Sequence, residues 1–341
     1  MTSWRKSLVL APFLTVLSLP SVGLAEELNI YTARHYDSDE ALYSAFTEET
    51  GIEVNTLEGD SDQLIQRIKR EGAASPADIL MTVDAGRLWR AEEEGVFQPV
   101  ESSVLQQRLP DQLRHPEGLW FGFSQRIRAI FYNRENIDPE LVQRYEDLTR
   151  AELEGEVCIR SSSNIYNQSL LASLIHHHGE EKAKEWAQGV VDNMARSPAG
   201  GDTDQIRAVA AGECSVGVAN HYYYVRLLKS DKIADRKAAR RVGIIFPNQE
   251  GRGAHANIGG AGVVAGAPNA DEARKFLEFL ASDKAQNIFA SGNNEFPVVD
   301  SAFADPVLES WGNFKTDDVN VSVLGRNNPR AVRLFDEVGW R

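Results

Sequence analysis

The first third of the chain alternates between apolar runs and amphipathic segments. Short apolar runs at 28–33, 52–57 and 77–84 predict β-strands. Segments 37–51 and 61–72 carry apolar residues at helical spacing and each ends at a glycine, which predicts helices. This strand–helix order predicts a parallel sheet with helices on both faces.

The remainder of the chain repeats the pattern with a second set of elements. Further strands are predicted at 129–133, 156–163, 214–220, 242–248 and 259–266, with helices between most of them and two closing helices within 271–292. The first of these strands leaves the first unit and the later ones return to it. We therefore expect an α/β fold of two lobes, joined by crossing hinge strands, with a ligand cleft between them. The expected N-terminal lobe is 26–126 plus about 248–300, and the C-terminal lobe is 127–247 plus about 301–341.

Residues 1–25 have the features of a secretory signal peptide. Arg5 and Lys6 precede an apolar stretch that is too short to span a membrane, and small residues occupy Gly23 and Ala25. We expect cleavage after Ala25 and export of a soluble, monomeric protein to the periplasm. Because nucleotide cofactors are scarce outside the cytoplasm, chemistry that depends on ATP or NAD is disfavoured.

Composition narrows the function further. The 341 residues include 36 basic and 50 acidic side chains, for a formal charge of −14. An acidic chain without a basic stripe disfavours nucleic acid as a partner. The sequence contains no GxSxG, HExxH or EF-hand pattern, so we expect no enzymatic activity.

Tyrosines gather where the predicted strands end. Five of the nine tyrosines lie at three strand-to-helix turns, and His35 stands beside one of them. In open α/β sheets these turns face the ligand. The residues concerned are His35, Tyr36, Tyr166, Tyr222, Tyr223 and Tyr224.

The two cysteines relate two of these turns. Tyr166 follows Cys158 by eight residues, and Tyr222 follows Cys214 by eight. If the two strands are parallel neighbours in register, both phenols reach the same height on the cleft rim. In an exported protein a Cys158–Cys214 disulfide is expected, and two separate buried thiols are the alternative.

A cluster of phenols suits a hard, highly charged cation. A tyrosine has a pKa of about 10 and stays protonated at neutral pH unless a multivalent cation favours the phenolate. Fe(III) meets that requirement, and four phenolates would leave the site with a negative charge that calls for a nearby cation, for which we nominate Arg126. On the residues alone, the alternatives are half-buried tyrosines that line a cleft wall and a cleft that stacks on a sugar or peptide. For Arg126 the alternative is a surface or interlobe salt bridge.

The sequence resembles the periplasmic ferric-iron-binding proteins that serve iron ABC transporters. The stretches that carry this resemblance are YTARHYDSD, ASPADI, SQRIRAIFYN, CIRSSSNIYNQSL and VANHYYYVRL. The resemblance implies a periplasmic-binding-protein fold that closes over Fe(III) and delivers it to an inner-membrane ABC permease. It implies Tyr36, Tyr166, Tyr222 and Tyr223 as iron ligands, His35 as a further ligand in some members, and Arg126 as an outer partner. Some relatives add a synergistic anion, for which Ser161–Ser163 are candidates, although a helix cap is the alternative.

Two further sequence motifs and two alternative functions have to be considered. His176–His178 lie at consecutive helical positions and cannot converge on one ion, so we expect a structural role. The GAGVVA stretch from Gly260 matches a dinucleotide fingerprint only in part and is expected to be a strand. The alternative functions are a binder of another small solute, such as an oxyanion or polyamine, and an exported hydrolase.

Overall fold

A computed structural model describes residues 26–34, 36, 38–302 and 305–341. The predicted signal peptide and His35 therefore lie outside the described residues. The strands are β1 (Glu27–Thr32), β2 (Glu53–Glu58), β3 (Ile79–Val83), β4 (Phe121–Asn133), β5 (Val157–Cys158), β6 (Val216–Asn220), β7 (Val242–Ile245) and β8 (Ala256–Val263).

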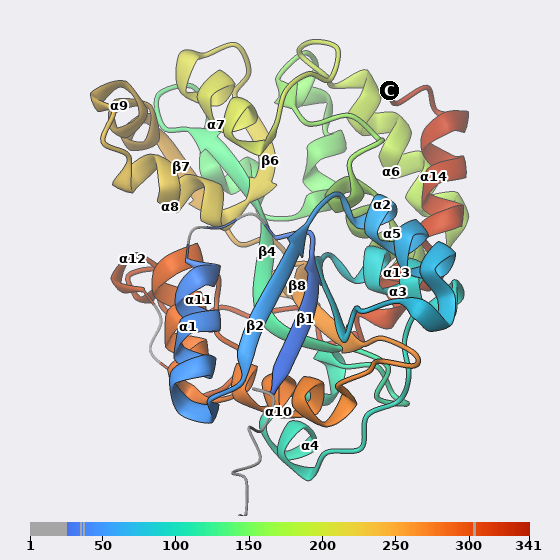
Figure 1. The fold of residues 1–341 in the computed structure, drawn as a ribbon. Coiled ribbons are helices and arrows are strands. Elements are labelled where there is room, and N and C mark those ends of the chain that lie inside the picture. Colours follow the sequence, from blue (N-terminus) through green and yellow to red (C-terminus); the bar gives the residue numbers. More distant parts are fainter. Residues whose placement is uncertain (1–25, 35, 37, 303–304) are drawn as a thin grey trace, which may run out of the picture.

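Helices cover the strands on both sides (Figure 1). They are α1 (Asp39–Thr50), α2 (Ser61–Glu71), α3 (Ala85–Glu93), α4 (Ser103–Arg108), α5 (Ile165–His178), α6 (Glu180–Asp192), α7 (Asp202–Ala211), α8 (His221–Lys229), α9 (Ile233–Arg241), α10 (Ala270–Leu280), α11 (Asp283–Asn293), α12 (Pro306–Glu309), α13 (Ser322–Arg326) and α14 (Asn328–Glu337). Short 3₁₀ turns add Gly72–Ala74, Asp111–Leu113, Pro139–Val142, Tyr145–Thr149 and Ala151–Leu153.

Local sequence explains where the first helices begin and end. The Asp60 side chain accepts hydrogen bonds from backbone N–H groups in the first turn of α2, which satisfies donors that a helix start leaves free. The apolar stripe of α2, Leu64, Ile65 and Ile68, is buried. Helix α1 ends at Gly51, whose φ of 76° is a left-handed conformation that glycine adopts without strain. These helices were predicted from the sequence, and the structure confirms them.

Strand β4 joins the two halves of the sheet. The strand order is β2-β1-β3-β8-β4-β6-β5, and β7 also pairs with β4. β1 is parallel to β2 and β3, and β5 is parallel to β6, whereas β4 and β8 run antiparallel to their partners. The first half of β4 pairs with β8, and its second half pairs with β6 and β7. One strand thus belongs to both halves and passes directly beneath the tyrosine turns.

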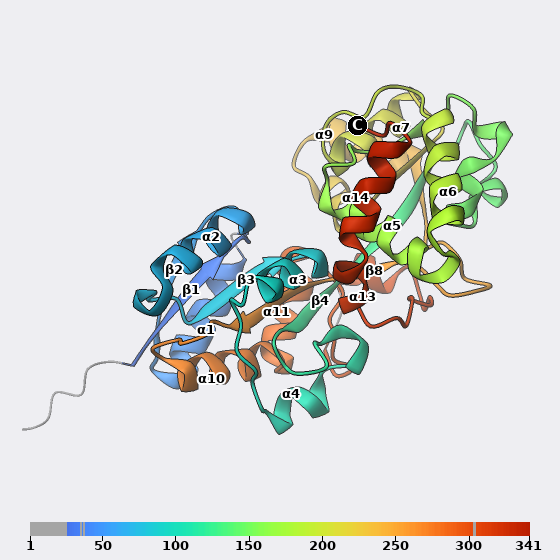
Figure 2. The same ribbon diagram turned by 90° about the vertical axis from the view of Figure 1, so that its right-hand side faces the viewer.

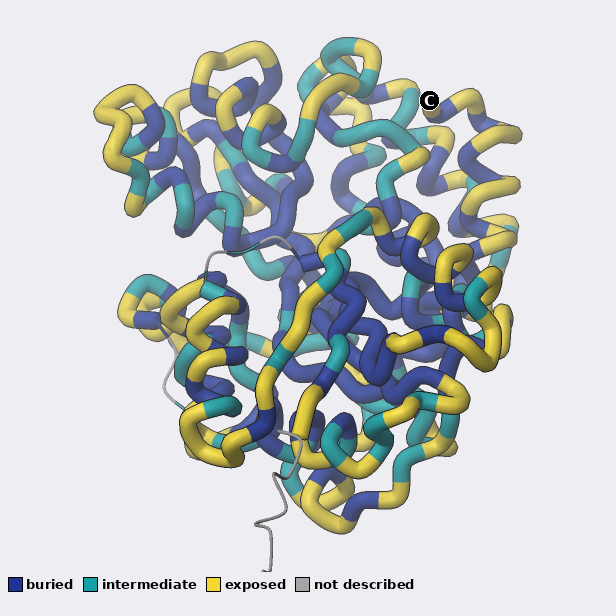
Figure 3. The backbone as a smooth tube through the Cα atoms, in the orientation of Figure 1, coloured by how far each residue is buried: buried dark blue, intermediate teal, exposed yellow. Residues whose placement is uncertain are grey.

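Each half of the molecule has its own apolar core. One buried cluster includes Phe46, Trp120 and Phe276, and a second includes Trp186 and Trp340. Seen from the side, the two bodies are connected mainly by β4 and β8 (Figure 2), and most of the burial lies inside each body rather than on its rim (Figure 3). The exact division of the chain between the lobes stays a prediction. Among the described residues, no helix is both long enough and apolar enough to span a membrane.

The lengths of two strands, β4 and β5, differ most from those predicted. β4 covers Phe121–Asn133, where only 129–133 was predicted, because its first half contains buried polar residues that break the apolar pattern. β5 is confined to Val157–Cys158, since the rest of 156–163 forms the turn before α5. The GAGVVA stretch begins inside β8, as expected, and does not open a helix.

Candidate metal centre

Two of the predicted tyrosines occupy equivalent places in the fold. Tyr166 is the second residue of α5 and Tyr222 is the second residue of α8. Each helix is preceded by an asparagine N-cap in extended conformation, Asn164 and Asn220. Side chains in the first turn of a helix project beyond the carboxyl end of the preceding strand. Both phenols therefore meet over the sheet, with their hydroxyl oxygens 3.4 Å apart.

The disulfide is confirmed, but the strand register behind it differs from the prediction. Cys158 and Cys214 are bonded, with 5.9 Å between their Cα atoms. Cys158 nevertheless pairs with Gly217 in the sheet, and Cys214 lies just before β6 begins. The phenols converge because both helices start at matching points, not because the cysteines face one another along the strands.

Tyr223 lies beside Tyr222, and Tyr224 turns away from both. The ring centroids of Tyr222 and Tyr223 are 4.4 Å apart. The hydroxyl of Tyr224 instead donates to the backbone carbonyl oxygens of Ala239 and Val242, which places it against α9. Tyr224 thus packs away from the tyrosine cluster.

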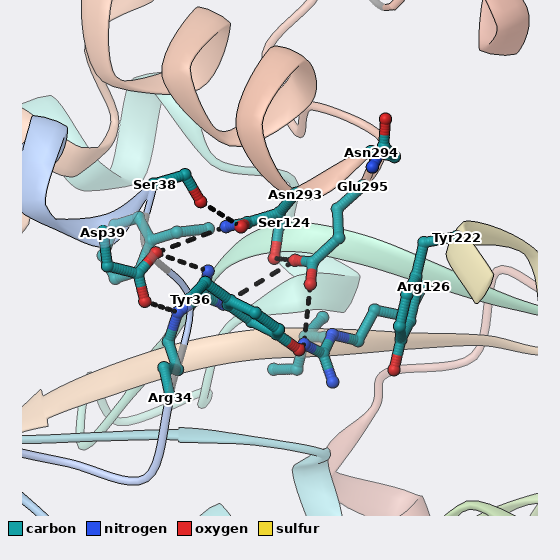
Figure 4. A network of polar contacts seen from close by, with 12 residues as sticks. Arg34, Tyr36, Ser38, Asp39, Ser124, Arg126, Tyr222, Asn293, Asn294 and Glu295 are labelled. Carbon is teal, nitrogen blue, oxygen red and sulfur yellow. Dashed lines mark hydrogen bonds and ion pairs between the residues drawn. The ribbon is translucent and has the colours of Figure 1, made fainter. Parts of the chain in front are cut away.

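Tyr36 reaches the cluster from the first half of the molecule through Arg126. Nη2 of Arg126 donates to the Tyr36 hydroxyl at 2.8 Å and to a carboxylate oxygen of Glu295 at 2.6 Å (Figure 4). The same guanidinium lies over the ring of Tyr222, 5.1 Å from its centroid. A side chain on the shared strand β4 therefore contacts tyrosines from both halves.

A second ion-pair network supports the turn that carries Tyr36. The guanidinium of Arg34 forms two hydrogen bonds with the carboxylate of Asp39, at 2.9 and 3.0 Å, and lies 3.7 Å from Glu295. Its charge also faces the Tyr36 ring, 4.9 Å from the centroid. These contacts fix the loop between β1 and α1 from below (Figure 4). His35 belongs to this loop, but it lies outside the described residues and its expected role as a ligand stays a prediction.

Glu295 holds its negative charge despite complete burial. Burial alone would raise the pKa of this carboxyl, but attraction to Arg126 and Arg34 outweighs burial and lowers the pKa to about 2. Ser124 also donates to the carboxylate. Sequence reasoning missed Glu295, because it follows α11 with no motif around it and reaches the site only through the fold.

The hydroxyls of Tyr222 and Tyr223 are neutral phenols in the metal-free protein. Burial raises the pKa of Tyr222 well above its ordinary value, and the neighbouring Tyr166 raises it further. Burial likewise raises the pKa of Tyr223. Ionising these groups together requires a strong positive charge among the oxygens, which a hard multivalent cation supplies.

The surroundings offer positive charge that the protein leaves partly unused. Among the described residues, no acceptor lies within hydrogen-bonding distance of Nε or Nη1 of Arg126, although this residue is only 1% exposed. The guanidinium of Arg226 faces the rings of Tyr36, Tyr222 and Tyr223 at 5.0–5.4 Å. Phenolates at this site would give both arginines, Arg126 and Arg226, a nearby negative charge. Arg226 was not anticipated from the sequence, although its position four residues after Tyr222 is a helical spacing that could have revealed it.

His221 connects the tyrosine turn to both halves of the molecule. Its Nδ1 accepts from the backbone N–H of Ile127 at 3.0 Å, and its Nε2 lies 3.0 Å from the carbonyl oxygen of Asn294. Burial lowers the pKa of this imidazole to about 4, so the ring is neutral and donates from Nε2. The tyrosine turn is therefore fastened to the crossing strand and to the turn that bears Glu295.

The other candidate groups take structural roles. His177 contacts the Asp317 carboxylate at 2.7 Å and His178 contacts the Glu146 carboxylate at 2.9 Å, so these two histidines have separate hydrogen-bond partners. In the described part of the chain, no group of three or more His, Cys, Asp or Glu side chains is arranged to hold a metal. The Ser161 hydroxyl accepts from the backbone N–H of Ser163, which stabilises the turn before α5.

Comparison with known proteins places this arrangement in a family. A family model described as "Bacterial extracellular solute-binding protein" matches residues 74–318. The chain belongs to this family. It is 51% identical to "Iron uptake protein A2" of Synechocystis, over 96% of this chain and 94% of the relative.

Solved structures extend the same relationship. A Trichodesmium protein, IdiA or FutA, described as "in complex with iron and citrate ligands", has a TM-score of 0.90 and 55% identity, over 92% of this chain and all of that one. The ferric binding protein of Campylobacter jejuni has a TM-score of 0.87 and 42% identity over 92% of this chain and 100% of that one. The resemblance to ferric-iron-binding proteins and the two-lobed α/β fold class are both confirmed.

Proposed function

We propose that this solute-binding protein captures Fe(III) in the cleft between its lobes and delivers it to an ABC permease. The observation that carries the proposal is the convergence of four phenols from three separate turns: Tyr36, Tyr166, Tyr222 and Tyr223. Two of their hydroxyl oxygens are 3.4 Å apart, a separation that one metal ion can bridge. The names of the relatives, which include iron uptake and ferric-iron binding, support the same cargo.

In this proposal each residue has a defined part. The four phenolates bind the ion, and His35 is a further ligand from the turn that carries Tyr36. Arg126 holds the Tyr36 oxygen in place and offers its remaining N–H groups to the ionised site. Glu295 keeps Arg126 oriented, and its charge also limits how much positive charge the site presents. Three phenolates balance Fe(III), and a fourth leaves a charge that Arg226 can offset.

An anion or water would complete the coordination shell. The citrate named for the Trichodesmium structure supports a small carboxylate in that place. Export through a signal peptide cleaved after Ala25, a monomeric state and the lack of enzymatic activity belong to the same proposal. They agree with a family of extracellular binding proteins.

A visible spectrum with metal analysis tests the cargo directly. An Fe(III)–phenolate centre gives a charge-transfer band, so the purified protein should be coloured with about one iron per chain and should lose its colour with a strong chelator. A colourless protein that binds phosphate or a polyamine would replace this proposal with the small-solute alternative. Ester or peptide hydrolysis by the iron-free protein would instead support the hydrolase.

A further inference from the structure

Helix α9 presents a basic face on a strongly acidic protein. Between Lys229 and Arg241 the sequence has six basic and two acidic residues, whereas the whole chain has a formal charge of −14. Of the two acidic residues, Asp235 is buried and paired with Arg207 at 2.8 Å, whereas Asp231 is exposed to solvent. The local field at α9 is therefore opposite in sign to that of the chain as a whole.

The basic residues of α9 point in one direction. Ile233, Lys237, Arg240 and Arg241 follow the i, i+4, i+7, i+8 spacing of one helix face, and all four are exposed. Among the described residues, Lys237 and Arg240 have no ion-pair partner, and only Arg241 has one, Glu135 at 2.9 Å. The helix lies on the outer surface of the second lobe, where Figure 3 shows it largely exposed.

An apolar side chain sits within this charged face. Ile233 is 63% exposed, more than the other large hydrophobic residues exposed in the described part of the chain, Val104 and Val332. A single isoleucine buries enough apolar surface to anchor a protein contact but, on its own, too little to hold a protein on a membrane. An exposed apolar residue on the same helix face as three cations, two of them without an ion-pair partner among the described residues, suits an interface with an acidic surface.

Hydrogen bonds connect α9 to the helix that carries part of the candidate metal centre. The Tyr224 hydroxyl donates to the carbonyl oxygens of Ala239 at 3.1 Å and Val242 at 3.0 Å, which fastens α8 to the end of α9. Tyr222 and Tyr223 lie in the same first turn of α8. A partner that displaces α9 therefore acts on two of the proposed iron ligands through one intervening side chain.

We propose that the exposed face of α9, formed by Lys232, Ile233, Lys237, Arg240 and Arg241, docks on an acidic, periplasm-facing surface of the membrane permease. This inference rests on the proposed function and adds the docking surface and its charge. Docking there displaces α9, and the hydrogen bonds between α9 and Tyr224 pass this displacement on to α8. The affinity of the metal site for its cargo then falls during delivery. By linkage, loaded and empty forms must then differ in affinity for the permease.

Charge reversal on α9 tests the surface. Lys237→Glu with Arg240→Glu changes the charge by four units without touching a buried residue. Uptake of radioactive iron is measured in host cells that lack the native copy and express either the variant or the wild type. We expect uptake to fall about tenfold or more, while Fe(III) titration of the purified variant matches the wild type. Ile233→Ser should lower uptake in the same direction.

A matched control separates docking from bulk charge. Lys182→Glu with Arg330→Glu makes the same charge change on α6 and α14, on the other side of the second lobe (Figure 1). This control should transport iron at the wild-type rate. Wild-type uptake by the α9 variant, or equal loss in the control, would overturn the inference while leaving iron binding intact. Binding of the wild type, but not the variant, to equimolar phosphatidylglycerol–phosphatidylcholine vesicles would assign the face to lipid and overturn it too. Failure of the proposed function is distinguishable, because the wild type itself would then show no iron band.

Discussion

The Tyr166 and Tyr222 hydroxyls lie 3.4 Å apart although 56 residues separate them in the sequence. The Tyr222 hydroxyl is neutral in the metal-free protein, because burial raises its pKa, and its contact with the Tyr166 hydroxyl is weak. In the proposed function, a cation between them would replace this contact with coordination by both oxygens. The same pair therefore offers the most direct test of the site.

Replacing Tyr166 by phenylalanine removes one of these oxygens and leaves the ring in place. We expect iron affinity to fall by at least about 100-fold, because the remaining oxygens must hold the ion with a ligand missing. The charge-transfer band should weaken and shift. Titration with Fe(III) in the presence of a competing chelator measures both effects.

Tyr43→Phe is the matched control for that experiment. Tyr43 is buried in the first lobe, where it packs against Phe276 rather than against the tyrosine cluster. Its loss of a hydroxyl should leave the iron titration unchanged. Equal titrations for Tyr166→Phe and the wild type would remove Tyr166 from the ligand set.

Arg126→Gln tests the charge next to Tyr36. Without the guanidinium, ionising the phenols becomes harder and Glu295 is left with Arg34 as its nearest cation. Iron should therefore be released at a higher pH than in the wild type, by about one pH unit. The measurement is the absorbance of the charge-transfer band during a slow acid titration.

The double variant Arg126→Gln with Glu295→Gln controls for the unpaired carboxylate. If the single variant fails only because Glu295 is buried without its partner, the double variant should regain folding stability. Its release of iron should still occur at higher pH than in the wild type. Restoration of the wild-type release profile would show that Arg126 serves the fold and not the phenolates.

Buried His255 makes the metal-free protein sensitive to mild acid. Burial lowers the pKa of this imidazole from 6.5 to about 3, against attraction from Asp317, while Arg128, Arg252 and His177 also disfavour its charged form. The unfolded chain takes up a proton below pH 6.5 and the folded chain does not, so stability falls as pH drops from 6.5 towards 3. Between pH 8 and pH 5 this histidine should cost about 2 kcal/mol of unfolding free energy.

Urea unfolding at several pH values, with His255→Gln as the comparison, measures this effect. At pH 8 the variant should be no more stable than the wild type. Between pH 6.5 and pH 5 its stability should fall less steeply than that of the wild type. Parallel pH profiles for the two proteins would contradict the assignment. The measurement uses iron-free protein so that release of the cargo does not contribute.

Removing the disulfide should weaken the fold more than the metal site. The Cys158–Cys214 bond closes a loop across a separation of 56 residues, and such a loop stabilises a protein by about 4 kcal/mol in the chain-entropy model. The double variant Cys158→Ala, Cys214→Ala should unfold at lower urea concentration by a corresponding amount. Since the tyrosine turns are positioned by the helix starts, its iron affinity should change by less than about tenfold. A variant that folds fully but no longer binds iron would contradict this prediction.

The sequence was sufficient to place the tyrosines, and insufficient to place their surroundings. Tyr166 and Tyr222 could be predicted because a strand that ends just before a helix fixes where the next side chains point. Their supporting charges could not be predicted in the same way. Glu295 and Arg34 come from opposite ends of the chain, and only the assembled sheet brings them within reach of Arg126.

Strand β4 shows why the pattern of apolar residues fails at such a site. Ser124, Arg126 and Arg128 are buried, although a buried strand normally consists of apolar side chains. Each is paired within the fold, so the polar pattern reflects the site rather than an exposed loop. The cysteine spacing misled for a related reason, because equal distances along the chain do not require equal positions in the sheet.

The pairing of Arg126 with Glu295 has a consequence for how the protein is made. These two residues are 169 positions apart in the sequence, and synthesis supplies the cation long before its carboxylate. Until residue 295 is available, the Arg126 guanidinium can donate to the Tyr36 hydroxyl but lacks the carboxylate that balances its charge. A chain that ends before residue 295 thus contains all nine tyrosines but lacks the carboxylate that orients Arg126 beside Tyr36.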